Sequence, residues 1–412
     1  MTAALEGITV LELANWVAAP SCGALMADLG ADVIKVEPLT GDSMRGKLRQ
    51  PSLPDDAPRT DFPFHLDNRG KRSVAVDLSN PRGAQLVVDL AQHADVLVTN
   101  LLPSRLERFG LGPEQVRAAN PRLVYGLVTG FGSEGPEADR IAFDLTAFFG
   151  RAGIMSLVAE PDQAPPAFRP GQGDHATGLA LLSAILAALL QRERTGQGQV
   201  VETNLLHVGA WTIGCDLGAT LVDRRQPTPR GRHEPISPLN TRYRCQDGAW
   251  INLAAHDQSA WPRVCRELGL DDLAEDERYD TARKRFQHGP ELVARLDEHF
   301  ASAPLDHWAP RLDAAGVLWD RVATLPDLLE DPQARAAGLF GEIEHPEVGR
   351  FETLTAPLSL HGGQVAVRGP APEIGEHTRE VLAGFGIPDE RIEELAASGV
   401  VGGADGNDAA IG

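Results

Sequence analysis

Cysteines are few and widely separated in this sequence. The 412 residues include four of them, and no two have the C-x-x-C spacing of a zinc site or a redox pair: Cys22, Cys215, Cys245 and Cys265. A chain of this length can bury a large core without cross-links, so a disulfide framework is not expected either. We therefore expect reduced thiols and no structural zinc site.

Positive charge is also scarce. Lys and Arg number 38 against 58 Asp and Glu, which gives a formal net charge of −20. Nucleic acids and anionic membranes attract proteins that concentrate positive charge on one face, so we expect neither as a partner. An anionic ligand is compatible with this charge only if it enters a local basic pocket.

The sequence has neither a long hydrophobic run nor a leader pattern. The longest apolar run, residues 179–190, contains Ser183 and is shorter than a bilayer span. The first residues include Glu6 and Glu12 and lack the basic segment of a signal peptide. With 42% hydrophobic and 23% charged residues, the composition is typical of a soluble globular protein, and we expect a cytoplasmic one.

Short β-rich runs alternate with helical patterns over the first half of the chain. Residues 8–13 and 31–37 predict strands, and a helix that opens at Pro20 lies between them. Strand, helix and strand in this order form a βαβ unit, which requires a parallel sheet. The alternation continues through expected strands at 73–78, 95–99 and 123–129 and expected helices at 81–94 and 179–190. Residues 1–215 therefore predict one large α/β domain.

The pattern changes after residue 215. Residues 224–240 are rich in Arg, Pro and Gly, as in a linker, and a hairpin pattern and three helical patterns follow. We expect a smaller α+β domain, a C-terminal return to the large domain and a disordered tail, at 216–325, 326–401 and 402–412 respectively.

The first βαβ unit does not have the dinucleotide-binding fingerprint. Glu37 ends the second expected strand, where an acidic residue often binds a ribose. The turn at 14–20, ANWVAAP, however, has no glycine at which a pyrophosphate could approach the backbone. A dinucleotide site is therefore not expected there.

Two aspartates stand among small or apolar neighbours. Asp144 lies in DRIAFDLTAFFG (139–150), and Asp174 lies in PGQGDHATG (170–178), just before the expected helix. Free backbone N–H groups and the helix dipole stabilise a carboxylate at such a junction. From these residues alone, an N-cap role for Asp174 competes with a catalytic one.

Taken in order, the motifs of the chain resemble those of the class III CoA-transferase family. This family includes formyl-CoA transferase, carnitine CoA-transferase and the α-methylacyl-CoA racemases. The matching segments are spread over nearly the whole chain: VLEL (10–13), LGADVIKVEP (29–38), NRGKRSV (68–74), ADVLVTN (94–100), NPRLVY (120–125), RTGQG (194–198) and GEHT (375–378).

The resemblance implies a fold and an assembly. The large domain is expected to be Rossmann-like and built from both chain ends, with the small domain inserted between them. Two ring-like subunits are expected to interlock as a homodimer. The substrates implied are an acyl-CoA and a free carboxylic acid, with coenzyme A as the acyl carrier and no metal.

The resemblance also implies a catalytic residue. In the family one aspartate attacks the acyl-CoA thioester, and the matching position is Asp174. An acyl–aspartyl anhydride and then an aspartyl-CoA thioester follow, and the acceptor carboxylate reverses these steps. A carboxylate held in place suits an activated thioester. Gly171, Gln172 and Gly173 are expected to offer backbone N–H groups to the developing oxyanions.

Further positions carry over from the family. Asp144 matches an acidic position that lines the thiol end of CoA, although an N-cap for a helix at 145–149 is an equal alternative. Lys71 and Arg72 are expected to neutralise phosphate. The complete set of expected CoA contacts is Val17, Ala18, Asn68, Lys71, Arg72, Asn100, Leu101 and Arg108.

Some positions depart from the family pattern. Pro38 and Leu102 stand where some members have arginine, and Ser104 replaces the usual glycine. RGRHEP (230–235) occupies the region of the glycine-rich lid of formyl-CoA transferase. Cationic residues in and near this region suit either a second substrate carboxylate or a solvated linker: Arg230, Arg232, His233 and Arg242.

The alternatives are a racemase of the same superfamily and a non-catalytic CoA-binding module. Racemases of the family place a histidine before the first aspartate, where this chain has Phe143, which cannot transfer a proton. A binding module would require Asp174 to be dispensable. The sequence therefore predicts a CoA-transferase, with a racemase or isomerase as the alternative.

Other catalytic classes have no support in the sequence. A serine hydrolase would need a G-x-S-x-G elbow, which is absent from the 412 residues. A metal enzyme would need histidines at ligand spacing, and these histidines do not have it: His175, His207, His233, His256 and His377.

Overall fold

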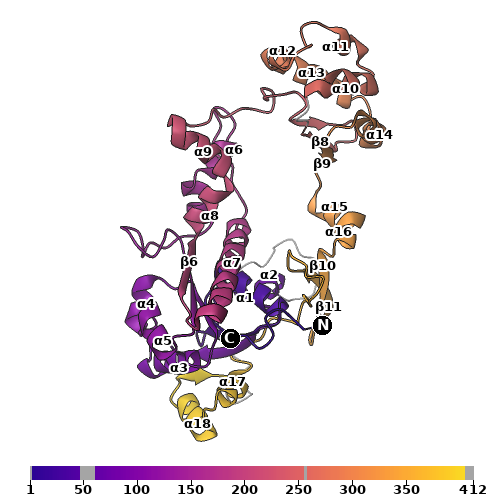
Figure 1. Ribbon diagram of the computed structural model, residues 1–412. Coiled ribbons are helices and arrows are strands. Elements are labelled where there is room, and N and C mark those ends of the chain that lie inside the picture. Colours follow the sequence, from indigo (N-terminus) through magenta and orange to yellow (C-terminus); the bar gives the residue numbers. More distant parts are fainter. Residues whose placement is uncertain (1, 47–60, 255–257, 404–412) are drawn as a thin grey trace. The chain divides into compact units, whose positions relative to one another are not determined.

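The computed structural model describes residues 2–46, 61–254 and 258–403 (Figure 1). His256 and most of the expected tail, residues 404–412, lie outside the described residues. The chain divides into two compact units. The large unit contains Met1–Met155, Ala167–Arg225 and Ala336–Gly412, and the small unit contains Ser156–Pro166 and Gln226–Arg335. The small unit thus begins and ends ten residues later than the expected 216–325 and takes in a segment from the first half of the chain.

The large unit is an α/β structure around a seven-stranded sheet, as expected for its class. The order in the sheet is β12-β3-β2-β1-β4-β5-β6, and neighbouring strands are parallel except for β12 against β3. The strands are β1 (Thr9–Leu13), β2 (Asp32–Glu37), β3 (Arg72–Val76), β4 (Val96–Thr99), β5 (Val124–Thr129), β6 (Val200–Asn204) and β12 (Val401–Gly402).

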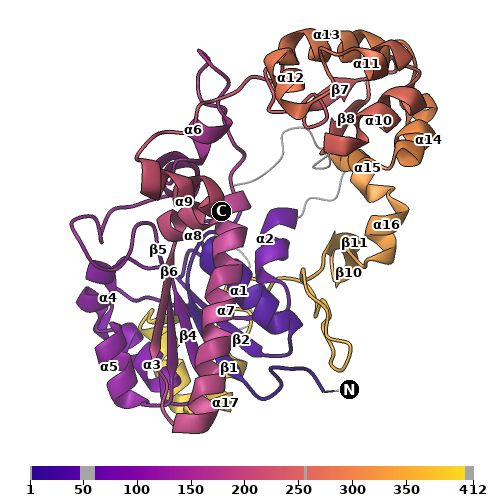
Figure 2. The same cartoon turned by 45° about the horizontal axis from the view of Figure 1, so that its top comes forward.

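Helices cover both faces of this sheet (Figure 2). The helices and the small hairpin of the large unit are α1 (Ala18–Asp28), α2 (Phe62–Asn68), α3 (Pro81–Ala91), α4 (Pro103–Phe109), α5 (Pro113–Ala119), the π-helix η1 (Leu145–Arg151), α7 (Gln172–Thr195), α8 (Leu205–Thr212), α9 (Gly214–Asp223), β10 (Phe340–His345), β11 (Gly349–Leu354), α17 (Thr378–Gly384) and α18 (Asp389–Ala397).

Alternate strand residues point to two separate cores, as the period of a β-strand requires. Val10 of β1 pairs with Val33 and Val96 on either side and packs against α1 and α7. Leu11, next in the strand, packs on the other face, where α3, α5, α17 and α18 lie. Strands that are buried on both faces consist of continuous apolar residues, so their positions can be predicted from the sequence.

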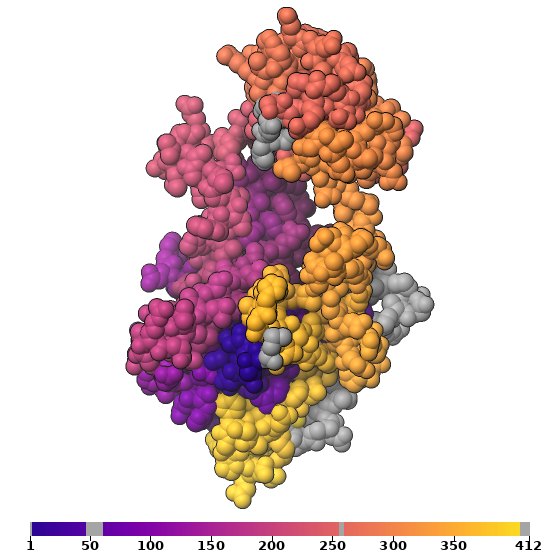
Figure 3. All heavy atoms as spheres, turned by 45° about the vertical axis from the view of Figure 1, so that its right-hand side comes forward, coloured from indigo at the N-terminus to yellow at the C-terminus, as the bar shows by residue number. Residues whose placement is uncertain are grey.

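The two chain ends meet in the large unit. β12 pairs with β3, and a further bridge joins Ala3 to Gln364. Figure 3 shows the N-terminal residues, in indigo, beside C-terminal segments in yellow and orange. Both ends of the chain therefore contribute to the same structure.

Helix α7 is longer than the apolar run at 179–190. It has 24 residues, so its length and composition alone would allow it to cross a membrane, as would α8 and α9 taken as one bent span. Its buried residues pack against α1 and the sheet instead, among them Leu181, Leu182 and Ile185. A long apolar helix in a protein core also meets the length and composition criteria for a membrane span. The apolar run at 179–190 therefore underestimated the length of α7.

The small unit has its own core, built on a three-stranded antiparallel sheet of order β7-β8-β9. Trp261, Phe300 and Trp308 are buried at its centre. Its elements are β7 (Arg242–Arg244), β8 (Trp250–Leu253), η2 (Gln258–Ala260), α10 (Trp261–Leu268), α11 (Asp271–Glu275), α12 (Ala282–Gln287), α13 (Gly289–Phe300), α14 (Leu305–Ala315), β9 (Trp319–Arg321) and α15 (Leu325–Leu329). Helices α6 (Ile154–Val158) and α16 (Pro332–Ala336) lie at the boundaries of the two units.

Candidate active site

A cavity of about 260 Å³ opens where the order of the sheet reverses, between β1 and β4. Chain crossovers leave this point to opposite sides, and ligands of α/β proteins bind there, outside the carboxyl ends of the strands. Residues that follow β1, β4 and β5 line the cavity, and Asp174 reaches it from α7. The lining consists of Asn15, Trp16, Ala18, Ser43, Asn100, Leu101, Leu102, Arg105, Val128, Thr129, Gly130, Arg140, Ile141, Ala142, Phe143, Asp174 and Leu205.

Asp174 lies in the first turn of α7, not before the helix. The helix begins at Gln172, and its N-cap residue is Gly171, whose φ of 98° is in the left-handed region open to glycine. The N-cap interpretation of Asp174 is therefore wrong. The positive end of a 24-residue helix instead faces a carboxylate that opens into the cavity.

Asp144 holds the start of this helix in place. It is 1% exposed, and its Oδ2 accepts hydrogen bonds from the N–H groups of Gly171 at 2.8 Å and Gly173 at 3.2 Å. Asp144 occupies the N-cap position of η1, as the alternative predicted, but its side chain makes no capping hydrogen bond there. Two of the three N–H groups expected to face an oxyanion are thus already bound by Asp144.

Gly173 permits this close approach. A Cβ atom at this position would lie 2.6 Å from Cγ of Phe148 and 2.9 Å from Cβ of Asp144, which is closer than packed carbon atoms can come. Any side chain here would push α7 away from η1. The glycine is therefore required by the packing of the site.

The surroundings of Asp174 make its carboxylate a stronger base than usual. Burial raises its pKa to about 7, the negative charges of Asp144 and Asp67 act in the same direction, and His175 opposes them. Such a group changes charge near neutral pH, which is typical of a residue that takes part in chemistry.

His175 is paired with a buried carboxylate. Its Nε2 lies 2.9 Å from Oδ1 of Asp67, which is almost fully buried at the end of α2. Burial alone would lower the pKa of His175, but the hydrogen bond and the charge of Asp67 outweigh it and raise the pKa. An imidazolium is therefore favoured beside Asp174.

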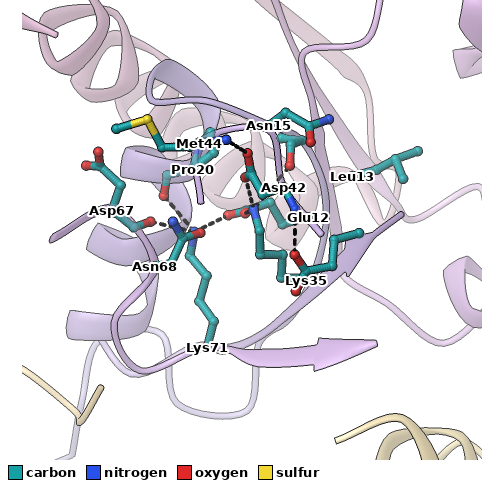
Figure 4. Close-up of polar contacts among 12 residues, drawn as sticks. Glu12, Leu13, Asn15, Pro20, Lys35, Asp42, Met44, Asp67, Asn68 and Lys71 are labelled. Carbon is teal, nitrogen blue, oxygen red and sulfur yellow. Dashed lines mark hydrogen bonds and ion pairs between the residues drawn. The ribbon is translucent and has the colours of Figure 1, made fainter. Parts of the chain in front are cut away.

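The ammonium group of Lys71 is already paired within the protein, which does not favour the predicted phosphate contact. Its Nζ is buried, lies 2.6 Å from Oε2 of Glu12 and donates to the carbonyls of Pro20 and Asp67 and to Oδ1 of Asn68, at 2.9, 2.7 and 3.0 Å (Figure 4). Asn68 is completely buried by the same contacts. Lys71 thus links β1, α1 and α2, and these four acceptors leave its ammonium group no hydrogen for a ligand phosphate.

Lys71 belongs to a buried network of two lysines and two carboxylates. Lys35 lies 3.0 Å from Oε1 of Glu12 and 2.7 Å from Oδ2 of Asp42, and all of these side chains are inaccessible to solvent (Figure 4). Burial, helped by the charge of Lys35, lowers the pKa of Lys71 to about 8 against the attraction of Glu12. The opposite charges are equal in number, as buried ions require.

Arg72 lies at the wrong edge of the sheet for CoA. It begins β3 and pairs with Asp32, the first residue of β2, and with Glu380. These residues are at the amino ends of parallel strands, whereas Asp174 lies beyond the carboxyl ends. This position does not favour the predicted phosphate contact at Arg72.

The other predicted CoA positions lie near the cavity. Ala18, Asn100 and Leu101 line it, as does Phe143, a predicted supporting residue, whereas Val17 is buried and clusters with Met44 and Phe64. A second cavity, of about 330 Å³, shares Asn15, Leu101 and Arg105 with the first and extends over the ends of β2 and β3. Arg108 lines this second cavity.

Two residues at the site are absent from the sequence prediction. Arg105 lines both cavities, and in the described part of the chain neither it nor Arg108 has an ion-pair partner. Some family members have arginine at the position of Leu102, and Arg105 lies one helical turn after it. The missing arginine could therefore have drawn attention to Arg105. Trp16 also lines the first cavity, and only its place in the turn after β1 could have indicated it.

The described residues contain no cluster of three or more His, Cys, Asp or Glu side chains able to hold a metal.

The basic residues of 230–242 lie in the small unit. There Arg232 donates to both carboxylate oxygens of Asp297, at 2.8 and 2.9 Å, so it is already paired.

Comparison with known proteins agrees with this architecture. A family model described as CoA-transferase family III matches residues 5–378. The chain is 33% identical to (R)-2-hydroxy-4-methylpentanoate CoA-transferase of Clostridioides difficile, over 96% of this chain and 99% of that protein. It is 34% identical to succinate–glutarate CoA-transferase of Agrobacterium fabrum, over 95% and 97%.

A solved structure is similar along nearly the whole chain. The crystal structure of a CAIB/BAIF family protein from Brucella suis superposes with a TM-score of 0.83 at 32% identity, covering 93% of this chain and all of that one. Both relatives named above are transferases, so the racemase alternative is not favoured. The chain belongs to CoA-transferase family III.

Proposed function

We propose that the protein moves CoA from an acyl-CoA donor to a free carboxylic acid through covalent intermediates on Asp174. The observation that carries this proposal is the position of Asp174, in the first turn of α7 and open to the cavity at the reversal point of the sheet. A carboxylate held there can attack a thioester that CoA brings along the carboxyl edge of the sheet.

The first half of the reaction transfers CoA to the enzyme. A carboxylate oxygen of Asp174 attacks the acyl carbonyl carbon, the C–S bond breaks, and CoA leaves as a thiolate. The product is a mixed anhydride. The thiolate then attacks the Asp174 carbonyl carbon, which releases the donor acid and leaves an aspartyl-CoA thioester.

The second half runs the same steps with the acceptor. Its carboxylate attacks the aspartyl thioester and expels CoA thiolate, forming a second anhydride. The thiolate attacks the acyl carbon of the acceptor, which yields the new acyl-CoA and restores Asp174. No net proton or electron is needed, so the carboxylate must only be ionised and correctly placed.

Asp144, His175 and the two cationic residues of α4 have supporting roles in this proposal. Asp144 fixes the turn that carries Asp174, and His175 supplies positive charge beside it. Arg105 and Arg108, which are free of carboxylate partners in the described chain, bind CoA phosphates in the second cavity.

The relatives are named for different acids, one branched hydroxy acid and one pair of dicarboxylates, so they support the reaction type more than the acid. The expected interlocked homodimer and cytoplasmic location also belong to the proposal. Light scattering of the purified protein measures the first, and fractionation of the producing cells measures the second.

The test combines a substrate panel with one variant. The protein is incubated with several acyl-CoA donors and free acids, and new thioesters are identified by mass spectrometry. The wild type should acquire a hydroxylamine-sensitive adduct on Asp174, whereas Asp174→Asn should fold, bind CoA and lose nearly all transfer. Substantial turnover by Asp174→Asn, or an adduct on Asp144, would contradict the mechanism.

A further inference from the structure

Trp16 and Phe143 form an aromatic wall on the cavity that contains Asp174. Their ring centroids are 5.3 Å apart and their planes cross at 88°, the edge-to-face arrangement of a favourable aromatic pair. Both remain accessible, at 38% and 47% of their surface. Large apolar side chains exposed inside a cavity indicate a surface for an apolar ligand group.

The backbone of Trp16 is held in an unusual conformation. Its φ of 67° lies in the left-handed region, which a bulky residue adopts only under constraint. Its N–H donates to Oδ1 of Asp42 at 3.0 Å, and the same oxygen accepts the N–H of Met44 at 2.8 Å. The other oxygen of Asp42 lies 2.7 Å from Lys35.

This constraint connects the aromatic wall to the buried network. The side chains of Asp42, Lys35 and Glu12 are all inaccessible to solvent (Figure 4). The backbone of Trp16 is therefore hydrogen-bonded to a carboxylate that buried ion pairs hold in place. A strained residue maintained by so many buried contacts is typical of a functional position. The network therefore places the indole at the cavity.

The rest of this side of the cavity is also apolar. Ile141, Ala142, Val128 and Leu205 contribute to the lining beside the aromatic pair. Of the basic residues that line it, Arg140 is paired with Glu137, and Arg105 lies where the two cavities join. A second carboxylate on the acid would have to compete with the CoA phosphates for Arg105, which is the basic residue of this lining without an ion pair in the described chain.

We propose that Trp16 and Phe143 are specificity-determining residues that select acids with an aromatic or branched apolar group. This inference rests on the proposed transfer of CoA through Asp174. The acid places its carboxylate at Asp174 and its apolar group against the indole and phenyl rings, where desolvation and edge-on ring contacts favour it over acetate or a dicarboxylate.

The experiment compares acids in one transferase assay at a saturating acyl-CoA donor. The acids are 3-phenylpropanoate, 4-methylpentanoate, acetate and glutarate, and the measurement is kcat/KM for each. The variants are Trp16→Ala, Phe143→Ala and the conservative Trp16→Phe. Trp211→Ala is the matched control, because Trp211 is 81% exposed and lies outside the lining of the cavity.

The wild type should prefer the phenyl and branched acids to acetate and glutarate. Both alanine variants should reduce this preference about tenfold, the range of a lost apolar contact in a specificity pocket. Trp16→Phe should retain most of it, and Trp211→Ala all of it. If Trp16→Ala does not fold, Phe143→Ala still provides the test, since it removes the other ring.

Three results would overturn the inference alone: wild-type preference for acetate or glutarate, an unchanged ranking in both alanine variants, or an equal loss for every acid with a raised KM for the donor. The last would show that the rings bind CoA rather than the acid. Absence of transfer from any donor to any acid by the wild type would overturn the proposed function together with the inference.

Discussion

The carboxylate of Asp67 lies 2.9 Å from Nε2 of His175, the residue that follows Asp174 in the first turn of α7. Asp67 is in turn fixed through its carbonyl group, which accepts a hydrogen bond from Lys71. A buried carboxylate therefore favours the cationic form of the imidazole beside Asp174, which must be negative to act as the proposed nucleophile.

This pair sets the pH dependence that we expect. Asp174 has a pKa raised to about 7, and its ionised form is the proposed nucleophile, so kcat/KM should rise as the pH increases through about 7. In His175→Gln the opposing positive charge is lost. The acid limb should then move to higher pH, with most activity regained on the alkaline side.

His207→Gln is the control for this experiment, because His207 is exposed on α8 and lies outside the cavity lining. Its pH profile should match that of the wild type. A uniform loss of activity in His175→Gln, with no displacement of the acid limb, would mean that His175 is only a packing residue.

The neighbours Lys71 and Arg72 should behave in opposite ways despite their adjacent positions. Lys71→Ala leaves Glu12 with one cation instead of two in a buried network, and breaking a buried pair costs about 3–5 kcal/mol of unfolding free energy. Arg72→Ala removes partly exposed pairs worth about 0–1 kcal/mol. Urea unfolding measures both.

The Lys71→Ala variant also distinguishes the buried role of Lys71 in the structure from the phosphate contact predicted from the sequence. If Lys71 contacted a phosphate, Lys71→Ala would weaken CoA binding and leave the unfolding midpoint in urea nearly unchanged. We expect the reverse, a lower midpoint.

Arg105 should contribute to CoA affinity. It lines both cavities and has no carboxylate partner in the described chain, so Arg105→Ala should weaken CoA binding by about 1–3 kcal/mol, the worth of charge-assisted hydrogen bonds. Calorimetric titration with CoA measures the change. Arg194→Ala, an exposed residue in the last turn of α7, should bind CoA like the wild type. Equal affinities for the two variants would remove Arg105 from the site.

Gly173 should not tolerate even a methyl group. In Gly173→Ala the new Cβ would meet Phe148 and Asp144, so α7 must shift and the position of Asp174 changes with it. We expect activity to fall by about 10²-fold or more, because a displacement of roughly 1 Å at the reacting group costs about that much. Gly218→Ala on α9, where no atom lies within 4 Å of the added Cβ, should be active and equally or more stable.

Most strands of the large unit could be predicted from the sequence, whereas the contacts of the site residues could be predicted only in part. The expected strands at 8–13, 31–37, 95–99 and 123–129 start one residue before β1, β2, β4 and β5 and end with them. Buried parallel strands are continuous apolar runs, and such runs depend on local residues alone.

The start of α7 and the place of Lys71 depend on distant partners instead. Gly171 and Gly173 are typical of a loop, and the helix includes Gln172 because Asp144 accepts their N–H groups. A Lys-Arg pair is typical of a surface, and Lys71 is buried because Glu12 and Asn68 surround its ammonium group. The catalytic role of Asp174 came from the family resemblance, because the residues around it could not distinguish a catalytic aspartate from an N-cap.

The pairing of β12 with β3 has a consequence for how the chain folds during synthesis. The strand that pairs along this edge of the sheet, Val401–Gly402, leaves the ribosome long after its partner β3. Until then β3 is an open edge on a partly assembled sheet, a template for unwanted pairing. Most of the small unit, Gln226–Arg335, is continuous and emerges before β12, so we expect it to fold before this edge of the large unit is complete.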